Sequence, residues 1–302
     1  MSKLMVVIAG PTGIGKTRTG IHLAQQFNSS IISADSRQVY KEIPIGTAAP
    51  TAEEQSLVPH YLIGTKSIFD YYSAWEFEQD ALSIAAELFN RYDIVFMVGG
   101  SMMYIDVFCN GVDDLPTVDP QLRNDLMERL ENEGLDAIRL QLKLLDPVFY
   151  EQVDLKNPKR VIHAVEICLM TGKPYSSLRT KTKKERPFDI LKIGLNMERN
   201  ELYNRINRRV LQMMDDGLES EAQQLVDHQN LNALNTVGFK ELFACFNGHH
   251  SMEKAVELIQ RNSRHYAKKQ LSWFRRDEQM QWFHPEDTTK ISEIIRNHLS
   301  GY

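Results

Sequence analysis

The stretch Leu4-Met-Val-Val-Ile-Ala9, followed by Gly10-Pro-Thr-Gly-Ile-Gly-Lys16-Thr17, decides the fold. Its first six residues are a short apolar run, which predicts a buried strand. The next eight fit the pattern GxxxxGK[ST], and the sequence then has a helical pattern to about Phe27. A strand, a glycine loop and a helix in this order indicate a P-loop, whose backbone amides and helix N-terminus bind phosphate groups.

Each part of this loop has a predicted task. Lys16 would place its charge on the terminal phosphate, and the Thr17 hydroxyl would help to hold Mg²⁺. The alternative, a glycine-rich turn with a chance lysine, is disfavoured by the flanking strand and helix. A P-loop by itself leaves kinases, nucleoside triphosphatases and other users of pyrophosphate open. The predicted pyrophosphate-binding residues of the loop are Gly10, Pro11, Thr12, Gly13, Ile14, Gly15, Lys16 and Thr17.

Further strands follow the first, and helical patterns separate them. Ile31–Ala34 and Ile94–Val98 are apolar runs, and Ile190–Met197 predicts a strand that returns to the same sheet. Strands that alternate with helices indicate an α/β domain with a parallel sheet. In such sheets ligands bind at the carboxyl ends of the strands. We therefore expect the P-loop, Asp35 and Ser101 to meet at one edge.

The middle and the end of the chain are helical. The stretch Asp114–Pro120 predicts a linker, and no strand is expected between it and Ile190. We interpret residues 116–186 as a helical insertion in a P-loop core made of residues 1–115 and 187–302. The helices expected in the insertion are Gln121–Glu133, Leu135–Leu145 and Lys159–Met170. Those expected in the C-terminal region are Glu198–Asp216, Leu218–Gln229, Lys240–Phe246 and Met252 to about Arg276.

Composition predicts a soluble protein of the cytoplasm. Of the 302 residues 42% are hydrophobic, which excludes a disordered chain, yet no apolar run is long enough to span a membrane. The three cysteines stand far apart, which argues against disulfides and against a zinc site. The net charge is −5, but residues 159–209 contain 13 basic and 5 acidic residues, and residues 261–276 contain 6 basic and none acidic. Such asymmetry predicts a phosphate-binding surface, although solvated helix faces would also produce it.

Asp35 is the one carboxylate expected at the phosphate edge of the sheet. The strand Ile94–Val98 ends in Gly99-Gly-Ser101 rather than in an acidic residue, so the usual metal-binding aspartate of P-loop enzymes is missing. A carboxylate beside an anion site would hold a metal ion or remove a proton from the attacking group. The alternative is that Asp35 caps a following helix.

Several motifs in order along nearly the whole chain resemble the tRNA dimethylallyltransferases, also called isopentenyl-tRNA transferases. Beyond the P-loop, the most specific are Asp35-Ser-Arg-Gln-Val-Tyr40 and Tyr266-Ala-Lys-Lys-Gln-Leu-Ser-Trp-Phe-Arg275. The others are Ile45-Gly-Thr47, Gly99-Gly-Ser101, Lys159-Arg-Val-Ile-His163 with Ala164-Val-Glu166, Arg205-Ile with Arg209, Gly217-Leu218 and Gly238-Phe-Lys-Glu241. The bacterial type is the better match, because no Cys/His spacing fits the zinc finger of eukaryotic relatives.

The resemblance implies transfer of a dimethylallyl group from dimethylallyl pyrophosphate to N6 of adenosine 37, in tRNAs that read U-initial codons. The P-loop would then hold pyrophosphate as the leaving group, with help from Arg205 or Arg209. Asp35 would accept the N6 proton, Lys16 would stabilise the leaving group, and Ser101 would hold N6 or Asp35. Mg²⁺ would be the cofactor, and we expect a monomer that does not bind membranes.

The resemblance also implies contacts with the anticodon stem-loop of tRNA, whose target base must leave its stack to react. The residues implied are Asp35, Ser36, Arg37, Gln38, Ser101, Arg123, Lys159, Arg160, Val161, Ile162, His163, Lys240, Lys268, Lys269 and Arg275. His163 stands where the family usually has arginine, which puts that contact in question.

Three rival functions stay open. An isopentenyltransferase of free adenine nucleotides would share the P-loop and Asp35, but it would not need the basic segments. A P-loop kinase would consume ATP. A non-catalytic RNA-binding protein would have no use for intact Lys16, Thr17 and Asp35.

Overall fold

Strand β1 (Leu4–Ala9) lies in the middle of a parallel sheet, and all six of its residues are buried. The computed structural model describes residues 3–113, 115–116, 119–179 and 183–300. In this part of the chain the sheet has six strands in the order β3-β2-β4-β1-β5-β6, every neighbouring pair parallel. The other strands are β2 (Ile31–Ala34), β3 (His60–Tyr61), β4 (Ile94–Gly99), β5 (Asp189–Leu195) and β6 (Gln281–Phe283).

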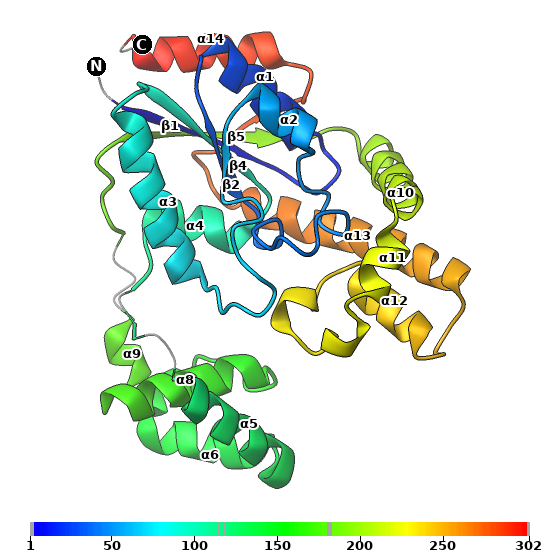
Figure 1. The fold of residues 1–302 in the computed structure, drawn as a ribbon. Coiled ribbons are helices and arrows are strands. Elements are labelled where there is room, and N and C mark those ends of the chain that lie inside the picture. The colour runs from blue at the N-terminus through cyan, green and yellow to red at the C-terminus, as the bar shows by residue number, and fades with distance from the viewer. Residues whose placement is uncertain (1–2, 114, 117–118, 180–182, 301–302) are drawn as a thin grey trace. The chain divides into compact units, whose positions relative to one another are not determined.

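Helices cover the sheet on both faces (Figure 1). On one face α1 (Lys16–Gln26) packs against α14 (Thr288–Leu299). On the other, α3 (Ala74–Phe89) packs against α4 (Met102–Asn110), which in turn contacts α13 (Met252–Phe274). The apolar residues of β1, such as Val6 and Ile8, are fully buried between these layers. The predicted α/β fold with a parallel sheet is confirmed.

The remaining helices of the sheet-containing part are α2 (Ala52–Leu57), α10 (Arg199–Asp215), α11 (Leu218–Gln223) and α12 (Phe239–Phe246), with short 3-10 turns at Val226–His228 and Asn232–Leu234. The predicted helix Leu218–Gln229 is wrong beyond Gln223. Only Leu218 and Ala222 are buried in α11. Tertiary packing therefore stabilises a helix of less than two turns and not a longer one. Strands β3 and β6 are not predicted, because each has only two or three residues.

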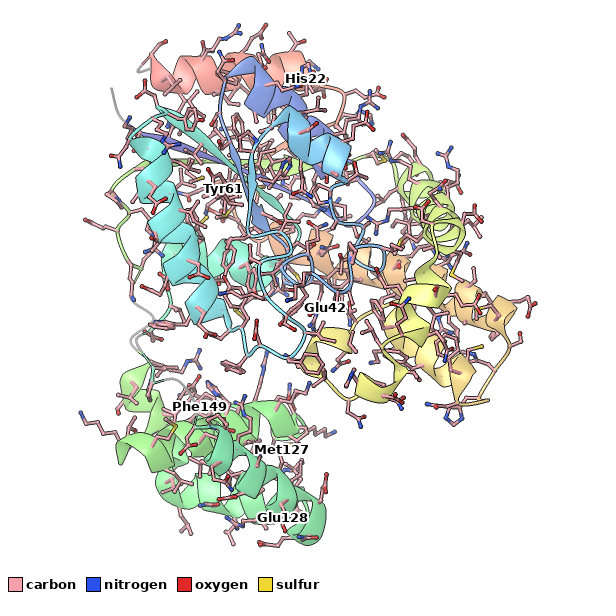
Figure 2. All side chains as sticks on the ribbon, viewed as in Figure 1. His22, Glu42, Tyr61, Met127, Glu128 and Phe149 are labelled. Carbon is pink, nitrogen blue, oxygen red and sulfur yellow. The ribbon has the colours of Figure 1, made fainter. Side chains whose placement is uncertain are left out.

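The chain divides into two compact units, residues 1–110 with 185–302 and residues 111–184. The insertion that the sequence predicts spans residues 116–186. Positions 114, 117 and 118 of the expected linker lie outside the described residues. The second unit has its own apolar core, which includes Leu126, Ile138 and Phe149 (labelled in Figure 2). Its helices are α5 (Pro120–Glu133), α6 (Leu135–Leu145), α7 (Pro147–Tyr150), α8 (Pro158–Thr171) and α9 (Tyr175–Leu178).

A buried ion pair holds the chain where it re-enters the first unit before β5. The Arg186 guanidinium pairs with the carboxylate of Glu78 and donates to the carbonyl oxygens of Val107 and Phe108, at the end of α4. The Glu78 side chain is 1% exposed. Removing either partner would leave the other charge buried and unpaired, which is costly.

No helix among the described residues is long and apolar enough to cross a membrane.

Candidate active site

The N-terminus of α1 is open to an anion. Gly15 precedes the helix with φ of 105°, a backbone conformation that favours glycine, and no side chain caps the first turn. The first turn also contains no acidic residue. By contrast, α2 and α3 begin with capping boxes formed by Thr51 with Glu54 and by Ser73 with Glu76. The free amides and the positive end of the helix dipole in α1 therefore favour a bound phosphate.

A glutamine from the far end of the sequence holds the tip of the P-loop. Gln270, on the buried side of α13, accepts a hydrogen bond from the Thr12 N–H at 2.8 Å and donates to the Gly100 carbonyl at 2.8 Å. A Cβ atom on Gly100 would lie 2.5 Å from Gln270 Nε2, so a side chain there would break this bridge. The Thr12 amide thus has a partner within the protein, and a contact between Thr12 and pyrophosphate stays a prediction. Gln270 was not predicted from the sequence.

Three cations surround the loop. Lys16 Nζ donates to the Pro11 carbonyl at 2.9 Å, and Arg205 Nε donates to the Gly13 carbonyl at 3.1 Å. Arg209 donates to the Thr12 hydroxyl, while its Nε is buried without a partner. Burial lowers the pKa of Lys16 to about 8, which the nearby Asp35 partly opposes, and burial also lowers the pKa of Arg209. Buried cations with so little opposing charge favour the binding of an anion.

Asp35 directly follows β2 and faces these cations. Its Oδ1 accepts hydrogen bonds from the Arg37 N–H at 2.9 Å and the Gln38 N–H at 3.3 Å, which fixes a turn. Its Oδ2 accepts no hydrogen bond from any described residue. No helix begins between Asp35 and α2, which Thr51 caps, so the alternative in which Asp35 caps the next helix is wrong. One carboxylate oxygen orients the side chain, and the other is left for a reacting group.

Two cavities meet at Asp35. The P-loop cavity, about 280 Å³, is lined by residues that include Gly15, Lys16, Thr17 and Arg205. The second cavity, about 320 Å³, is lined by residues that include Ser263, Tyr266 and Lys240. The residues that line both are Thr12, Asp35, Thr47 and Arg209. A group held by the P-loop and a molecule in the second cavity would therefore meet beside Asp35.

The motif after Asp35 braces the walls of these cavities. Arg37 donates to the carbonyl oxygens of Asn232 at 2.8 Å and Ala233 at 3.1 Å, and Gln38 Nε2 donates to those of Thr47 and Ala48. Their side chains are thus bound to the protein itself. Ser36 lines the second cavity. The tRNA contacts expected of Ser36, Arg37 and Gln38 stay predictions.

Two further carboxylates, both missed by the sequence analysis, fix neighbouring loops. Glu221 of α11 accepts the N–H groups of Ile45 (2.9 Å) and Gly46 (2.7 Å), next to Thr47. Glu42, labelled in Figure 2, accepts the Ser67 hydroxyl and the Ile68 N–H. Neither pairing could be predicted from local sequence patterns, because each joins segments that are far apart in the chain.

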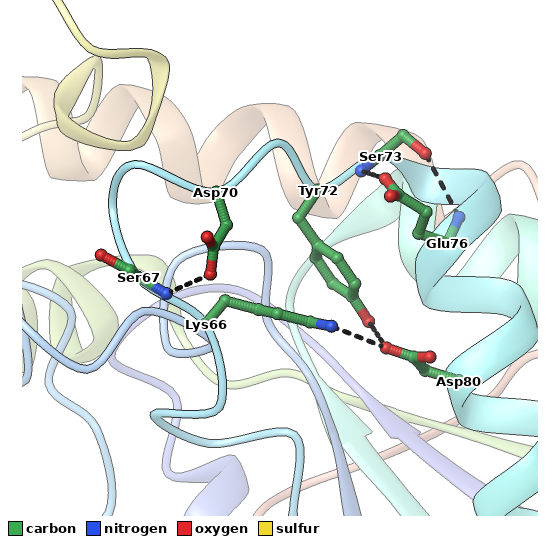
Figure 3. Close-up of polar contacts among 7 residues, drawn as sticks. All are labelled: Lys66, Ser67, Asp70, Tyr72, Ser73, Glu76 and Asp80. Carbon is green, nitrogen blue, oxygen red and sulfur yellow. Dashed lines mark hydrogen bonds and ion pairs between the residues drawn. The ribbon is translucent and has the colours of Figure 1, made fainter. Parts of the chain in front are cut away.

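The segment between β3 and α3 is tied down by the contacts drawn in Figure 3. Lys66 Nζ lies 3.3 Å from the Asp80 carboxylate and 4.7 Å from the centre of the Tyr72 ring. The Tyr72 hydroxyl donates to Asp80 at 3.0 Å, and burial together with this bond raises the pKa of Tyr72. Backbone pairing between Tyr40 and Lys66 joins the segment to the loop after Asp35. These contacts therefore connect α3 to the loop that follows Asp35.

Ser101 lies at the start of α4 and is 7% exposed. Its N–H donates to the Ala34 carbonyl at 3.0 Å, and its hydroxyl accepts the Tyr104 N–H at 3.4 Å. It is not among the residues that line either cavity. Its role toward N6 or Asp35 stays a prediction.

In the second unit, some of the predicted tRNA-binding residues are exposed and others are buried. Lys159 and Arg160 are exposed in the first turn of α8, which Asn157 caps. Val161 and Ile162 are 0% and 4% exposed and pack in the core of this unit. The prediction that these two side chains bind tRNA is therefore wrong: a helix that packs on one face must bury some residues of any continuous motif.

The other two predicted residues of this unit share one buried carboxylate. Arg123 makes two hydrogen bonds of 2.7 Å with Glu166, whose side chain is 0% exposed, and His163 Nδ1 lies 3.5 Å from the same carboxylate. The hydrogen bonds from Arg123 and His163 outweigh burial and lower the pKa of Glu166. Glu166 thus fixes both side chains, whose contacts with tRNA stay predictions.

Three basic residues predicted to bind tRNA lie on α13 or directly after it. Lys268, Lys269 and Arg275 are exposed. Since successive helix residues are about 100° apart, Lys268 lies nearly opposite the buried Gln270. Lys268 and Arg275 line a separate cavity of about 300 Å³ with Arg199 and Tyr203 of α10. No described acidic residue lines that cavity, which makes it a favourable place for an anion.

The donors available for Mg²⁺ are oxygens. Thr17 lines the P-loop cavity together with the carboxylates of Asp35 and Glu54. No cluster of three or more His, Cys, Asp or Glu residues suited to a metal occurs among the described residues. This donor set fits Mg²⁺, which is usually held by one or two protein ligands, phosphate oxygens and water.

Comparison with known proteins identifies the family of the chain. A family model described as IPP transferase matches residues 38–277. The chain belongs to this family. It is 56% identical to tRNA dimethylallyltransferase 2 of Parabacteroides distasonis over 98% of each chain, and 54% identical to tRNA dimethylallyltransferase 1 of Bacteroides thetaiotaomicron over 97% of this chain and 95% of the relative. Among solved structures, it is similar to the tRNA isopentenylpyrophosphate transferase of Bacillus halodurans, with a TM-score of 0.72, 35% identity, and coverage of 100% of this chain and 98% of the other.

The lowered pKa of Lys16 predicts a pH dependence. Below about pH 8 this lysine is protonated and attracts an anion, whereas above it the free amine adds no charge. The affinity for inorganic pyrophosphate should therefore fall as the pH rises above about 8. Titration calorimetry between pH 7 and pH 9.5 measures this.

The matched control is Lys16→Arg, because arginine stays charged throughout this range. Any titration of pyrophosphate itself is common to both proteins. Parallel pH profiles for the wild type and Lys16→Arg would contradict the assignment.

Proposed function

We propose that the chain transfers a dimethylallyl group from dimethylallyl pyrophosphate to N6 of adenosine 37 in tRNAs that read U-initial codons. The products would be N6-(dimethylallyl)adenosine and pyrophosphate. The observation that carries this proposal is that Asp35 and Arg209 line both cavities, so one carboxylate and one cation stand where two substrates would meet.

In this mechanism the bond between C1 of the dimethylallyl group and the pyrophosphate oxygen breaks, and its electron pair leaves with pyrophosphate. Lys16, Arg209 and the first amides of α1 stabilise the charge that develops there. The N6 nitrogen attacks C1, and Asp35 accepts the proton that N6 loses. Arg205 supports the loop through the Gly13 carbonyl and lines the same cavity.

Mg²⁺, held through the Thr17 hydroxyl, would neutralise charge on the pyrophosphate. Every residue that the mechanism uses comes from one chain, so we propose a monomer. Because its substrate is tRNA, we propose that it works in the cytoplasm.

The basic segments favour a tRNA substrate over a free adenine nucleotide. A free nucleotide would need only the two cavities, whereas Lys159, Arg160, Lys268 and Arg275 lie outside both of them. A kinase is the remaining rival, since P-loops commonly hold ATP.

Asp35→Asn tests the base. The amide cannot accept the N6 proton, so turnover should fall by about 10²–10⁴-fold. Affinity for tRNA should change little, because the side chain keeps its size and its turn-forming oxygen. Single-turnover transfer and filter binding measure the two effects, and near-normal turnover would rule out this base. ATP hydrolysis that depends on substrate would instead indicate the kinase.

Replacing Lys268 and Lys269 by alanine tests the tRNA surface. Each lost phosphate contact should lower the slope of log affinity against log salt by up to about one unit. Transfer at saturating tRNA should stay within about tenfold, because neither side chain lines the two cavities. Affinity measured at several salt concentrations decides the matter.

Lys254→Ala is the control, because this lysine is on the same helix but is paired with Glu257. Equal slopes for the wild type and the double variant would mean that the basic face is only solvated.

A further inference from the structure

Tyr266 stands out among the residues that line the two cavities. Of the described residues in both linings, it alone has an aromatic side chain. It lies on α13 one turn before Gln270, and its side chain, 38% exposed, lines the second cavity with Asp35 and Ser263.

The ring and the hydroxyl of Tyr266 have no partner among the described residues. Three other tyrosines of the first unit do have such partners. The Tyr72 hydroxyl donates to Asp80, Tyr104 stacks on Phe77 with ring centres 4.0 Å apart, and the Arg199 guanidinium lies 5.1 Å from the Tyr203 ring. Tyr266 instead presents an unoccupied aromatic surface to the cavity.

The electrostatic surroundings keep this surface neutral. Burial raises the pKa of Tyr266 to about 12, and the negative charge of Asp35 acts in the same direction. The Arg37 guanidinium opposes this shift. The phenol therefore stays protonated at any pH where the protein works, and it adds no second negative charge beside the proposed base.

We propose that Tyr266 stacks on the adenine that leaves the anticodon loop, and so selects and orients the target base. This inference rests on the proposed function. A base that leaves its stack loses contact with its neighbours, and an aromatic ring restores part of that interaction. The rest of the lining suits a base: Asn235, Thr236 and Lys240 supply polar groups for its edges.

The test combines a protein change with an RNA change. Two anticodon stem-loops are used, one with adenosine and one with an abasic residue at the target position. Base–aromatic stacking changes affinity by about 5- to 150-fold. Tyr266→Leu should lose affinity for the adenosine RNA by a factor in this range, and should bind the abasic RNA as the wild type does. Tyr266→Phe keeps the ring and should bind both RNAs as the wild type does.

Two controls separate stacking from structural damage. Tyr266 lines the second cavity but not the P-loop cavity. The affinity of a folded Tyr266→Leu variant for pyrophosphate should therefore be unchanged. Trp273→Leu removes another aromatic side chain of α13 that is also 38% exposed, and any effect should be the same on both RNAs.

Equal losses on the two RNAs in Tyr266→Leu, or no loss on either, would overturn the role of Tyr266. A loss in Tyr266→Phe as large as in Tyr266→Leu would assign the effect to the hydroxyl and would also overturn stacking. The proposed function fails separately, if the wild type transfers no dimethylallyl group to the adenosine RNA.

Discussion

The candidate site is built on an accumulation of like charge: two buried cations, Lys16 and Arg209, lie beside the uncapped N-terminus of α1. Together they form a strongly positive site, which the negative charge of Asp35 partly opposes. Such a site is unfavourable until an anion enters, so it has to be built into rigid surroundings. The bridge from Thr12 through Gln270 to Gly100 and the bond from Arg209 to Thr12 supply that rigidity.

The same arrangement limits what the site can do. A phosphate cradle alone would suit many enzymes, but here its cavity shares Asp35 and Arg209 with a second cavity. The carboxylate is held by one oxygen, through the turn at Arg37 and Gln38, and its other oxygen is left for a proton. In the proposed mechanism, leaving-group stabilisation and proton removal therefore take place close together, as a transfer to a weak nucleophile requires.

Sequence reasoning succeeded where the signal is local. The P-loop, the position of Asp35 at the end of β2 and the long helix α13 depend on residues that are neighbours in the chain. No role was predicted for Gln270 or Glu221, because each forms hydrogen bonds with residues far away in sequence: 258 positions separate Gln270 from Thr12. Motif matching also assigned a binding role to residues that are buried. It assigned RNA contacts to Val161 and Ile162, although one side of α8 must form the core of its unit.

The central claim is that the P-loop holds a leaving pyrophosphate and not a nucleotide that is consumed. Mass spectrometry of nucleosides tests it most directly, after unmodified tRNA is incubated with the protein, dimethylallyl pyrophosphate and Mg²⁺ in the absence of ATP. The proposed mechanism predicts one dimethylallyl-bearing adenosine beside the anticodon, formed together with pyrophosphate. Unmodified adenosine without ATP, or a product that appears only when ATP is added and hydrolysed, would contradict it.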